Sequence, residues 1–399
     1  MLKRGSSGGI YIHPWDITDE GIDDCYDFLD QSCGLNELFV AAAYHASTFV
    51  LPHNPKRLVR WDDGGIYFTP KHARWGDTSI QPALGSGVDS DSYLTQIVDK
   101  ARDRDWGVLF FVVFHYSVPL PTRYPHTCCI DALGEPHRTY LCPSNPDVRS
   151  YDLALVEELL DTYSGDGIRH ESLGFGGWNQ IALCDKVEVL PTPRDQFLLS
   201  LCFCEHCVSR AHEEDVDALS LRGSIRDHLY RSLPQNPTEW DDSAPDEQWA
   251  RNVFGGQLWR YLDVRCNTVS SLFGEVQNLC NSHDAAFMPF GTRNDRDVMA
   301  CNDYSLMYPH LKRVSLGATG NDPVAQRTSL QAAIEEVPHH AEPEIMHNQR
   351  SFDSSPKLKE AVMLARDVGI RHHSFHYYGM SRRHELEWIG DSRDAWTKG

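Results

Sequence analysis

The sequence predicts a (β/α)8 barrel, a ring of eight parallel strands joined by helices. Three observations predict it: short β-rich apolar runs alternate with helical stretches along nearly the whole chain, eight such runs can be counted, and 399 residues suit one large barrel with extended loops. The alternative, a doubly wound open sheet, lacks its usual signal, because no strand leads into a G-x-G-x-x-G turn. We therefore expect a single barrel domain over residues 1–399, with a cysteine-rich insertion at about 181–249.

The eight runs are bounded by glycine, proline or polar residues, as strands are. In chain order they are Gly9–Trp15, Glu37–Tyr44, Gly107–His115, Ser172–Trp178, Ala285–Phe290, Arg313–Ala318, Glu344–Asn348 and His373–Tyr378. The intervening segments that read as helices open on a polar or proline residue. They include Asp19–Cys33, Ser92–Arg104, Asp147–Tyr163, Pro323–Val337 and Pro356–Val368.

The charge balance restricts the possible partners. Asp and Glu number 57 and Lys and Arg 37, which gives a formal net charge of −20. Such a surface repels nucleic acid and anionic lipid, and no local basic patch offsets it. No apolar run approaches the roughly 20 residues that a bilayer requires, and residues 1–9 contain no apolar signal segment. We therefore expect a cytoplasmic protein that binds neither nucleic acid nor membrane.

A group of three cysteines indicates a metal site. Cys202, Cys204 and Cys207 place three thiols within six residues. Zn²⁺ prefers four such ligands in a tetrahedron, and a site closed by four thiolates is structural, with no open position for water. Cys184 is a nearby candidate for the fourth ligand, and His206 could replace one thiolate. The alternative is a set of reduced, buried cysteines without metal.

Several segments resemble the family 42 glycoside hydrolases, barrel enzymes related to bacterial β-galactosidases. They are Arg138-Thr139-Tyr140-Leu141-Cys142-Pro143-Ser144-Asn145-Pro146, the run Ser172–Trp178, the C-x-C-x-x-C group, and less specifically Gly9–Trp15 and Gly34-Leu35-Asn36. The resemblance is good from about Gly9 to Ala211 and weaker beyond. It implies a structural zinc ion with Cys142 as the fourth ligand. It also leaves a homo-oligomer open, since family members commonly trimerise.

The two catalytic carboxylates of that family are missing at the expected positions. The resemblance implies an Asn-Glu pair at the end of the fourth strand, where this chain has Asn179-Gln180, and a Glu ending the seventh strand, which falls near His347. Glutamine cannot exchange a proton usefully near neutral pH. Glu344 precedes the seventh strand end by several residues, toward the inert end of the barrel. Ordinary retaining β-galactosidase chemistry is therefore not expected.

The predicted carboxyl ends of the strands gather polar and aromatic side chains that suit a sugar. Aromatic faces stack on the C–H surfaces of a sugar ring, while amides, imidazoles and guanidinium groups bind its hydroxyls or a carboxylate. The expected substrate-binding residues are His13, Trp15, His45, Trp178, Asn179, Gln180, Arg293, Asn348 and Tyr378. The preferred proton-transfer candidates are His115, Tyr116, His376 and Tyr377, with His347, Asp16, Asp295 and Asp322 as further catalytic or metal-binding groups.

These features together predict a carbohydrate-active, glycoside hydrolase-like enzyme that acts on a glycoside or a sugar acid with non-standard catalytic residues. One alternative is a lyase or isomerase that uses His and Tyr as acid and base. Another is a barrel that binds sugar without catalysis, because the family carboxylates are absent at Gln180 and His347.

Overall fold

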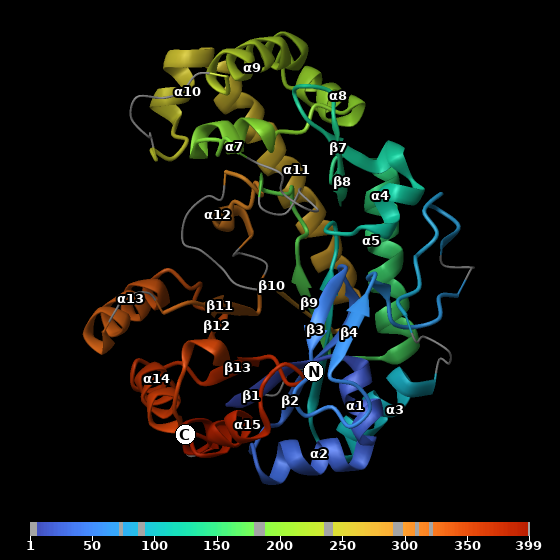
Figure 1. Cartoon of the computed structure of the whole chain (residues 1–399), viewed down its shortest axis with the longest axis vertical. Helices are drawn as coiled ribbons and strands as arrows, with labels where there is room; N and C mark the ends of the chain where they lie inside the picture. The colour runs from blue at the N-terminus through green and yellow to red at the C-terminus, as the bar shows by residue number, and fades with distance from the viewer. Residues whose placement is uncertain are drawn as a thin grey trace.

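Eight parallel strands form a nearly closed barrel in the computed structural model, which describes residues 6–71, 75–86, 92–178, 188–234, 242–289, 298–307, 311–318 and 322–397 (Figure 1). The strands are β1 (Ser7–Ile12), β2 (Glu37–Tyr44), β6 (Gly107–Val113), β9 (Gly167–Glu171), β10 (Ala286–Pro289), β11 (Arg313–Leu316), β12 (Glu342–Asn348) and β13 (His372–His376). Hydrogen-bonded ladders follow the order β10-β9-β6-β2-β1-β13-β12-β11. The end strands β10 and β11 contact each other, which brings the ring close to closure. The (β/α)8 prediction is confirmed.

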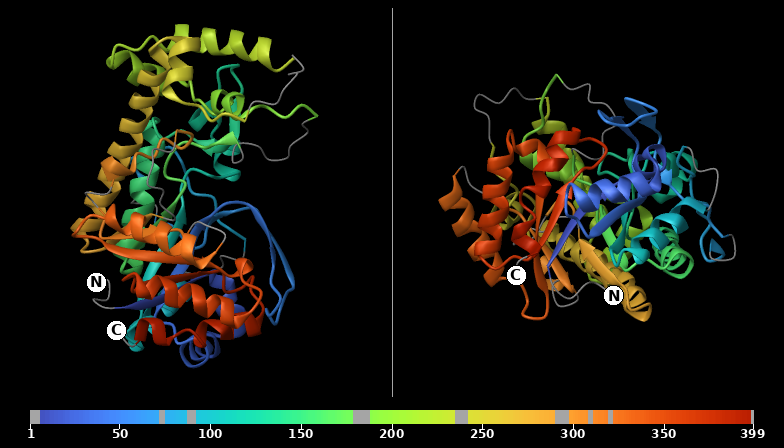
Figure 2. Two further views of the ribbon diagram at one scale, coloured as in Figure 1. Left: turned by 90° about the vertical axis from the view of Figure 1, so that its left-hand side faces the viewer. Right: turned by 90° about the horizontal axis from the view of Figure 1, so that it is seen from below.

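Helices cover the outside of the barrel, as the view from below shows (Figure 2). They are α1 (Pro14–Glu20), α2 (Ile22–Gln31), α3 (Ser92–Asp103), α5 (Pro146–Glu158), α11 (Gln257–Ser282), α13 (Pro323–Glu335), α14 (Ser355–Asp367), α15 (Arg383–Gly390) and α16 (Asp394–Thr397). Their starts follow the expected capping chemistry, since Asn145 and Asp322 accept hydrogen bonds from the first backbone N–H groups of α5 and α13. Of the helices described, none combines the length and apolar character needed to cross a bilayer.

A long excursion separates β9 from β10. It contains α7 (Pro193–Leu199), α8 (Glu205–Glu213), α9 (Ala218–Ser232) and α10 (Glu247–Phe254), which gather beyond the carboxyl ends of the strands (Figure 1). The long helix α11 returns the chain from this group to the barrel wall (Figure 2). A hairpin of β7 (Cys128–Ile130) and β8 (Pro136–Leu141), which follows β6, lies on the same side.

One strand lies elsewhere than the sequence predicts. The fourth strand was expected at Ser172–Trp178, but β9 spans Gly167–Glu171, so that prediction is wrong. The misleading feature is its composition, because Arg169, His170 and Glu171 make β9 look like a polar loop. The correction moves the end of the fourth strand from Trp178 to Glu171.

Two ion-paired arginines fill the amino-terminal half of the barrel interior. Arg313 donates to both oxygens of Glu37 at 3.1 and 2.8 Å and lies 3.4 Å from Glu344. Arg169 lies 2.8 Å from the other oxygen of Glu344, which also accepts a hydrogen bond from Ser374. These charged groups are all fully buried, so each charge is stabilised by its ion-pair partners in place of water.

Candidate active site

Glu171 is a carboxyl group at the mouth of the barrel, by which we mean the carboxyl ends of the eight strands. Strand alternation turns Gly167, Arg169 and Glu171 toward the barrel interior, while His170 faces outward and stacks on Phe287. Burial raises the pKa of Glu171 to about 7. A carboxyl group with this pKa is partly protonated near neutral pH and can both give and take a proton.

Four tyrosines surround this carboxyl group. Burial raises the pKa of Tyr11, Tyr44, Tyr116 and Tyr377, and the negative charge of Glu171 raises each of them further. The hydroxyls of Tyr44 and Tyr377 are hydrogen-bonded at 2.9 Å. Because these phenols stay protonated at neutral pH, they serve as hydrogen-bond donors rather than nucleophiles.

An aromatic wall lies on one side of the mouth. The ring of Trp15 stacks on that of His13 with centroids 4.5 Å apart, and the guanidinium of Arg60 lies 4.0 Å from the Trp15 ring. Within the described residues, His13 Nε2 and Trp15 Nε1 are buried without a hydrogen-bond partner. The His13 ring also lies beside Tyr377, with centroids 5.7 Å apart, so one of these unpaired nitrogens is close to the mouth.

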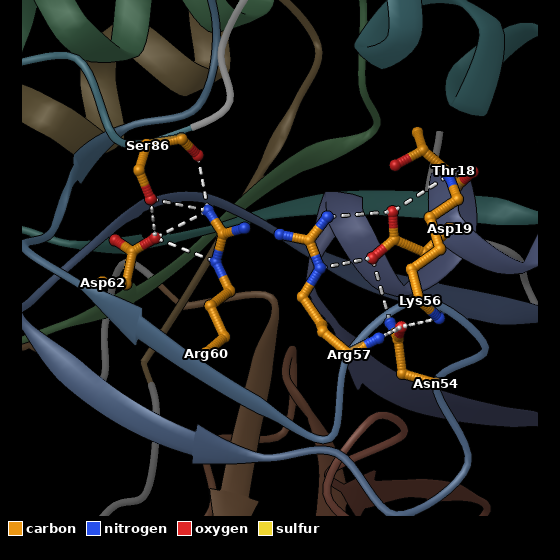
Figure 3. Close-up of polar contacts among 8 residues, drawn as sticks. All are labelled: Thr18, Asp19, Asn54, Lys56, Arg57, Arg60, Asp62 and Ser86. Atoms are coloured by element: carbon orange, nitrogen blue, oxygen red, sulfur yellow. Dashed lines mark hydrogen bonds and ion pairs between the residues drawn. The ribbon is translucent and has the colours of Figure 1, made fainter.

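Ion pairs fix this wall in place (Figure 3). Arg60 belongs to a hairpin of β3 (Ser47–Val50) and β4 (Val59–Asp62), and it binds Asp62 at 2.7 Å and the hydroxyl of Ser86 at 2.9 Å. At the turn of the same hairpin, Arg57 lies 3.0 Å from Asp19 of α1. The β3–β4 hairpin is therefore anchored both at its turn and on β4, which fixes the Arg60 guanidinium over the Trp15 ring.

Two imidazoles complete the mouth as neutral groups. Burial, with a smaller effect of the charge of His13, lowers the pKa of His376 to about 3. Burial also lowers the pKa of His45, whose ring centroid lies 4.7 Å from that of Tyr116. Both are hydrogen-bond acceptors or bases at neutral pH rather than cations.

The structure thus brings together His13, Trp15, His45, Tyr116, His376 and Tyr377 of the residues chosen from sequence. Asn348 ends β12 nearby, where its side chain accepts a hydrogen bond from the backbone of Arg350. Asn179, Gln180, Arg293 and Asp295 lie outside the described residues. Their part in the site stays a prediction.

Other candidates lie apart from this group. His115 is fully buried, with one ring nitrogen 2.8 Å from Asp152 of α5 and the other 2.9 Å from the carbonyl of Gly174, so it ties the strand to a covering helix. His347 faces outward from β12, where it lies 3.1 Å from His373, and burial lowers its pKa. Neither position supports the catalytic role that the sequence suggested.

The remaining candidates have structural partners. Tyr378 donates to Glu20 at 2.7 Å, and Asp16 accepts from the backbone N–H of His13 at 3.1 Å. Trp178 packs partly buried against the main core, and Asp322 caps α13. A role of these residues in substrate binding or catalysis stays a prediction.

Glu171 is the residue that sequence reasoning missed. The available signal was a carboxylate two positions after Arg169 in a segment that begins with Gly167-Ile168, which fits a strand whose charged side chains point into a barrel. The misplaced fourth strand hid it.

The cysteine cluster lies outside the mouth. The sulfur atoms of Cys142, Cys202, Cys204 and Cys207 all lie within 4.8 Å of one another and are buried, with Cys142 Sγ 3.5 Å from both Cys204 Sγ and Cys207 Sγ. Tetrahedral zinc with Zn–S bonds of about 2.3 Å needs sulfurs about 3.8 Å apart, so the cluster is compatible with a structural metal such as zinc.

Comparisons with known proteins agree with this architecture. The structure is similar to a family 42 β-galactosidase from G. stearothermophilus, with a TM-score of 0.58 and 10% identity over 100% of this chain and 57% of that chain. α-L-Fucosidase isoenzyme 2 from Paenibacillus thiaminolyticus gives a TM-score of 0.57 at 13% identity over 97% of this chain and 49% of the other. The fold of this chain is therefore similar to the barrels of these two glycoside hydrolases.

A β-galactosidase from Marinomonas ef1 is also similar, with a TM-score of 0.54 and 9% identity over 97% of this chain and 59% of that chain. The chain thus spans about half to three fifths of the length of these enzymes. No protein-family profile matches the sequence. A stretch of 116 residues is 28% identical to 4-hydroxyphenylpyruvate dioxygenase from Legionella pneumophila (strain Corby), over 27% of this chain and 33% of that protein.

Proposed function

We propose that this protein is a glycoside-processing enzyme in which Glu171 gives a proton to the glycosidic oxygen of the substrate. The observation that carries the proposal is the position of Glu171 at the end of the fourth strand, facing the mouth, with its pKa raised to about 7 by burial. The barrel likeness to glycoside hydrolases supports the reaction class. The reaction class rests on fold analogy, whereas the role of Glu171 rests on its position and its raised pKa.

The reaction is hydrolysis. The proton of the Glu171 carboxyl group passes to the leaving oxygen as its bond to the anomeric carbon breaks, and water supplies the hydroxyl group that replaces it. The hydroxyls of Tyr44 and Tyr377 are hydrogen-bonded to each other, and the one whose proton is not used between them donates a hydrogen bond to a sugar oxygen.

Activation of the water needs a second group. At the end of the seventh strand the described residue is Asn348, and Glu344 is committed to Arg169 and Arg313. Asp295, chosen from sequence beyond the fifth strand, is the residue that we assign to this role.

Replacement of the carboxyl group by an amide tests the proposal. We would assay the wild type, Glu171→Gln and the exposed control Glu360→Gln on methyl β-galactoside, α-fucoside and β-glucuronide, because the poor methoxide leaving group must be protonated as it departs. The proposal expects kcat on the best substrate to fall by at least about 100-fold in Glu171→Gln alone. Unchanged turnover in Glu171→Gln would refute it.

A second candidate function is β-elimination from a sugar acid. The neutral imidazole of His45 beside the phenol of Tyr116 favours it, since these two groups could take and return a proton. Elimination creates a carbon–carbon double bond, and hydrolysis does not. Ultraviolet absorbance of the products on a polyuronate substrate therefore separates the two reactions, and binding in calorimetry without any product would favour a non-catalytic barrel.

We also infer that the four-cysteine cluster holds one structural zinc ion. The thiolates would bind the metal directly, and the backbone N–H of Ile130 donates to Cys202 Sγ at 3.3 Å. The ion would join the β7–β8 hairpin to α8 and so hold the excursion against the barrel.

A further inference from the structure

A cavity of about 770 Å³ opens beside the mouth. It lies between the β3–β4 hairpin, the ends of β12 and β13, and the start of α15. His376 and Tyr377 line both this cavity and the mouth, so a ligand can extend from one into the other. The volume is that of a typical small-ligand site.

Arg350 brings an uncompensated positive charge to this cavity. In the part of the chain that the structure describes, no carboxylate lies within 4.0 Å of its guanidinium, which contacts the sulfur of Met380 at 3.9 Å. The other charged side chains there are paired: Arg382 lies 2.9 Å from Glu385, and Asp353 lies 2.7 Å from Lys357. An exposed guanidinium without a carboxylate partner can pair with the oxygens of an anion.

Gln349, the neighbour of Arg350, gives an independent sign of a ligand. Its side chain is only 8% exposed and lines the cavity, yet its amide oxygen and nitrogen have no hydrogen-bond partner among the described residues. Leaving such buried groups unpaired costs about 1–3 kcal/mol each. Both atoms are closed off from solvent in this arrangement, so a polar ligand in the cavity satisfies them once the Gln349 side chain rotates toward it.

We propose that this cavity binds an oxyanion carried by a sugar, either the carboxylate of an acidic sugar or a phosphate group. Arg350 pairs with the oxyanion, and Gln349 hydrogen-bonds the same sugar. The side chains of Phe352 and Trp388 supply apolar surface for its ring. Loops after the seventh and eighth strands are also where TIM barrels frequently hold phosphate. The inference rests on the proposed function and narrows its substrate class to acidic glycosides.

Calorimetry with four probes tests it: sodium D-glucuronate, D-glucose 6-phosphate, D-glucose and inorganic phosphate. Each is titrated into the wild type, Glu171→Gln, Arg350→Met and the control Arg226→Met, which removes the same charge from an exposed position on α9. We expect at least one acidic sugar to bind the wild type, and to bind at least 10-fold more weakly to Arg350→Met. Arg226→Met should match the wild type within about twofold. The acid that binds more tightly identifies carboxylate or phosphate as the natural group.

Three results would overturn the inference: no binding of either acidic sugar, equal affinity for D-glucose, or unchanged affinity in Arg350→Met. Binding of inorganic phosphate but of neither sugar would count against it too, because the sugar-binding part would be wrong. Gln349→Leu is the second variant in case Arg350→Met melts early, and it should weaken binding in the same order of probes.

The outcome is separable from that of the proposed function. Glu171→Gln should still bind the acidic sugar, because the cavity contains no part of that carboxyl group. If Glu171→Gln loses turnover but neither acidic sugar binds the wild type, only the proposed oxyanion site is refuted. If an acidic sugar binds as expected but Glu171→Gln keeps full turnover, only the proposed role of Glu171 is refuted.

Discussion

The carboxylate of Glu344 lies 2.8 Å from the guanidinium of Arg169, and both side chains are fully buried inside the barrel. A second arginine, Arg313, forms ion pairs with this carboxylate and with that of Glu37. These pairs lower the pKa of Glu344 despite the opposing effect of its burial, so the residue stays ionised as a structural anion. It is therefore unavailable as a catalytic nucleophile.

Replacement of this anion should destabilise the protein strongly. Glu344→Gln leaves two buried guanidinium groups with one carboxylate, and we expect the free energy of unfolding to fall by about 3–5 kcal/mol. Glu342→Gln is the control, because that carboxylate is half exposed and pairs with His372 at 3.0 Å. Urea unfolding of both variants measures the difference, and equal midpoints would contradict the structural role.

The activity should decline as the pH rises above about 7. Glu171 must carry its proton to act as an acid, and burial raises its pKa to about 7. We expect kcat/KM to fall about tenfold per pH unit on the alkaline limb. A limb centred near pH 5 would instead indicate that Glu171 titrates as an ordinary exposed carboxyl group.

The same carboxyl group should make stability depend on pH. Its pKa rises from 4.5 in the unfolded chain to about 7 in the folded one, so the folded chain favours the protonated form. The contribution of Glu171 to the free energy of unfolding is therefore fully present below pH 4.5 and is lost as the pH rises through 7. Relative to Glu171→Gln, the wild type should lose about 2–3 kcal/mol between pH 4.5 and 8. Unfolding of both proteins at several pH values measures it, and a constant difference would mean that Glu171 is not buried.

Loss of the metal site should release the excursion. We expect about one zinc ion per chain, and Cys204→Ser should lower the melting temperature by several degrees because structural zinc contributes folding energy. Cys280→Ser is the control, since this buried cysteine lies on α11 outside the four-cysteine cluster. Metal analysis and thermal melting test both points. A metal-free protein that melts at the same temperature would favour buried free thiols.

The buried pair of His115 and Asp152 should matter for folding and not for turnover. Asp152→Asn weakens the 2.8 Å contact to His115, and we expect the free energy of unfolding to fall by about 1–3 kcal/mol. The value of kcat per folded molecule should stay within about twofold of the wild type. A large loss of kcat in a well-folded variant would restore His115 as a catalytic candidate.

The sequence was sufficient for the barrel because most of its strands are apolar. The Glu37–Tyr44 run coincides with β2, and helices such as Ser92–Arg104 differ from the structure by a single residue. The prediction of the fourth strand is wrong because its inward side chains, Arg169 and Glu171, are charged. Arg169 is paired with Glu344, and Glu171 is buried by residues far away in sequence. No local pattern reveals such partners.

The same limitation affected the candidate site. The aromatic and histidine side chains at the ends of β1, β2 and β13 were found because they follow recognisable strands. His115 and His347 were placed at the mouth by the same rule, although each turns toward a buried partner instead. Side-chain direction at a strand end depends on tertiary packing, which the residue order alone does not specify.

The excursion after β9 also affects how the chain folds. Gly167 pairs with Ala286 across it, so the neighbouring strands β9 and β10 meet only after a very long loop has closed. Loop closure costs conformational entropy that grows with the logarithm of loop length and slows formation of such distant contacts. Metal bound to the cysteine cluster would barely shorten this path, because Cys142 precedes β9 and the other three cysteines lie within the excursion, so the rate of refolding should depend little on zinc.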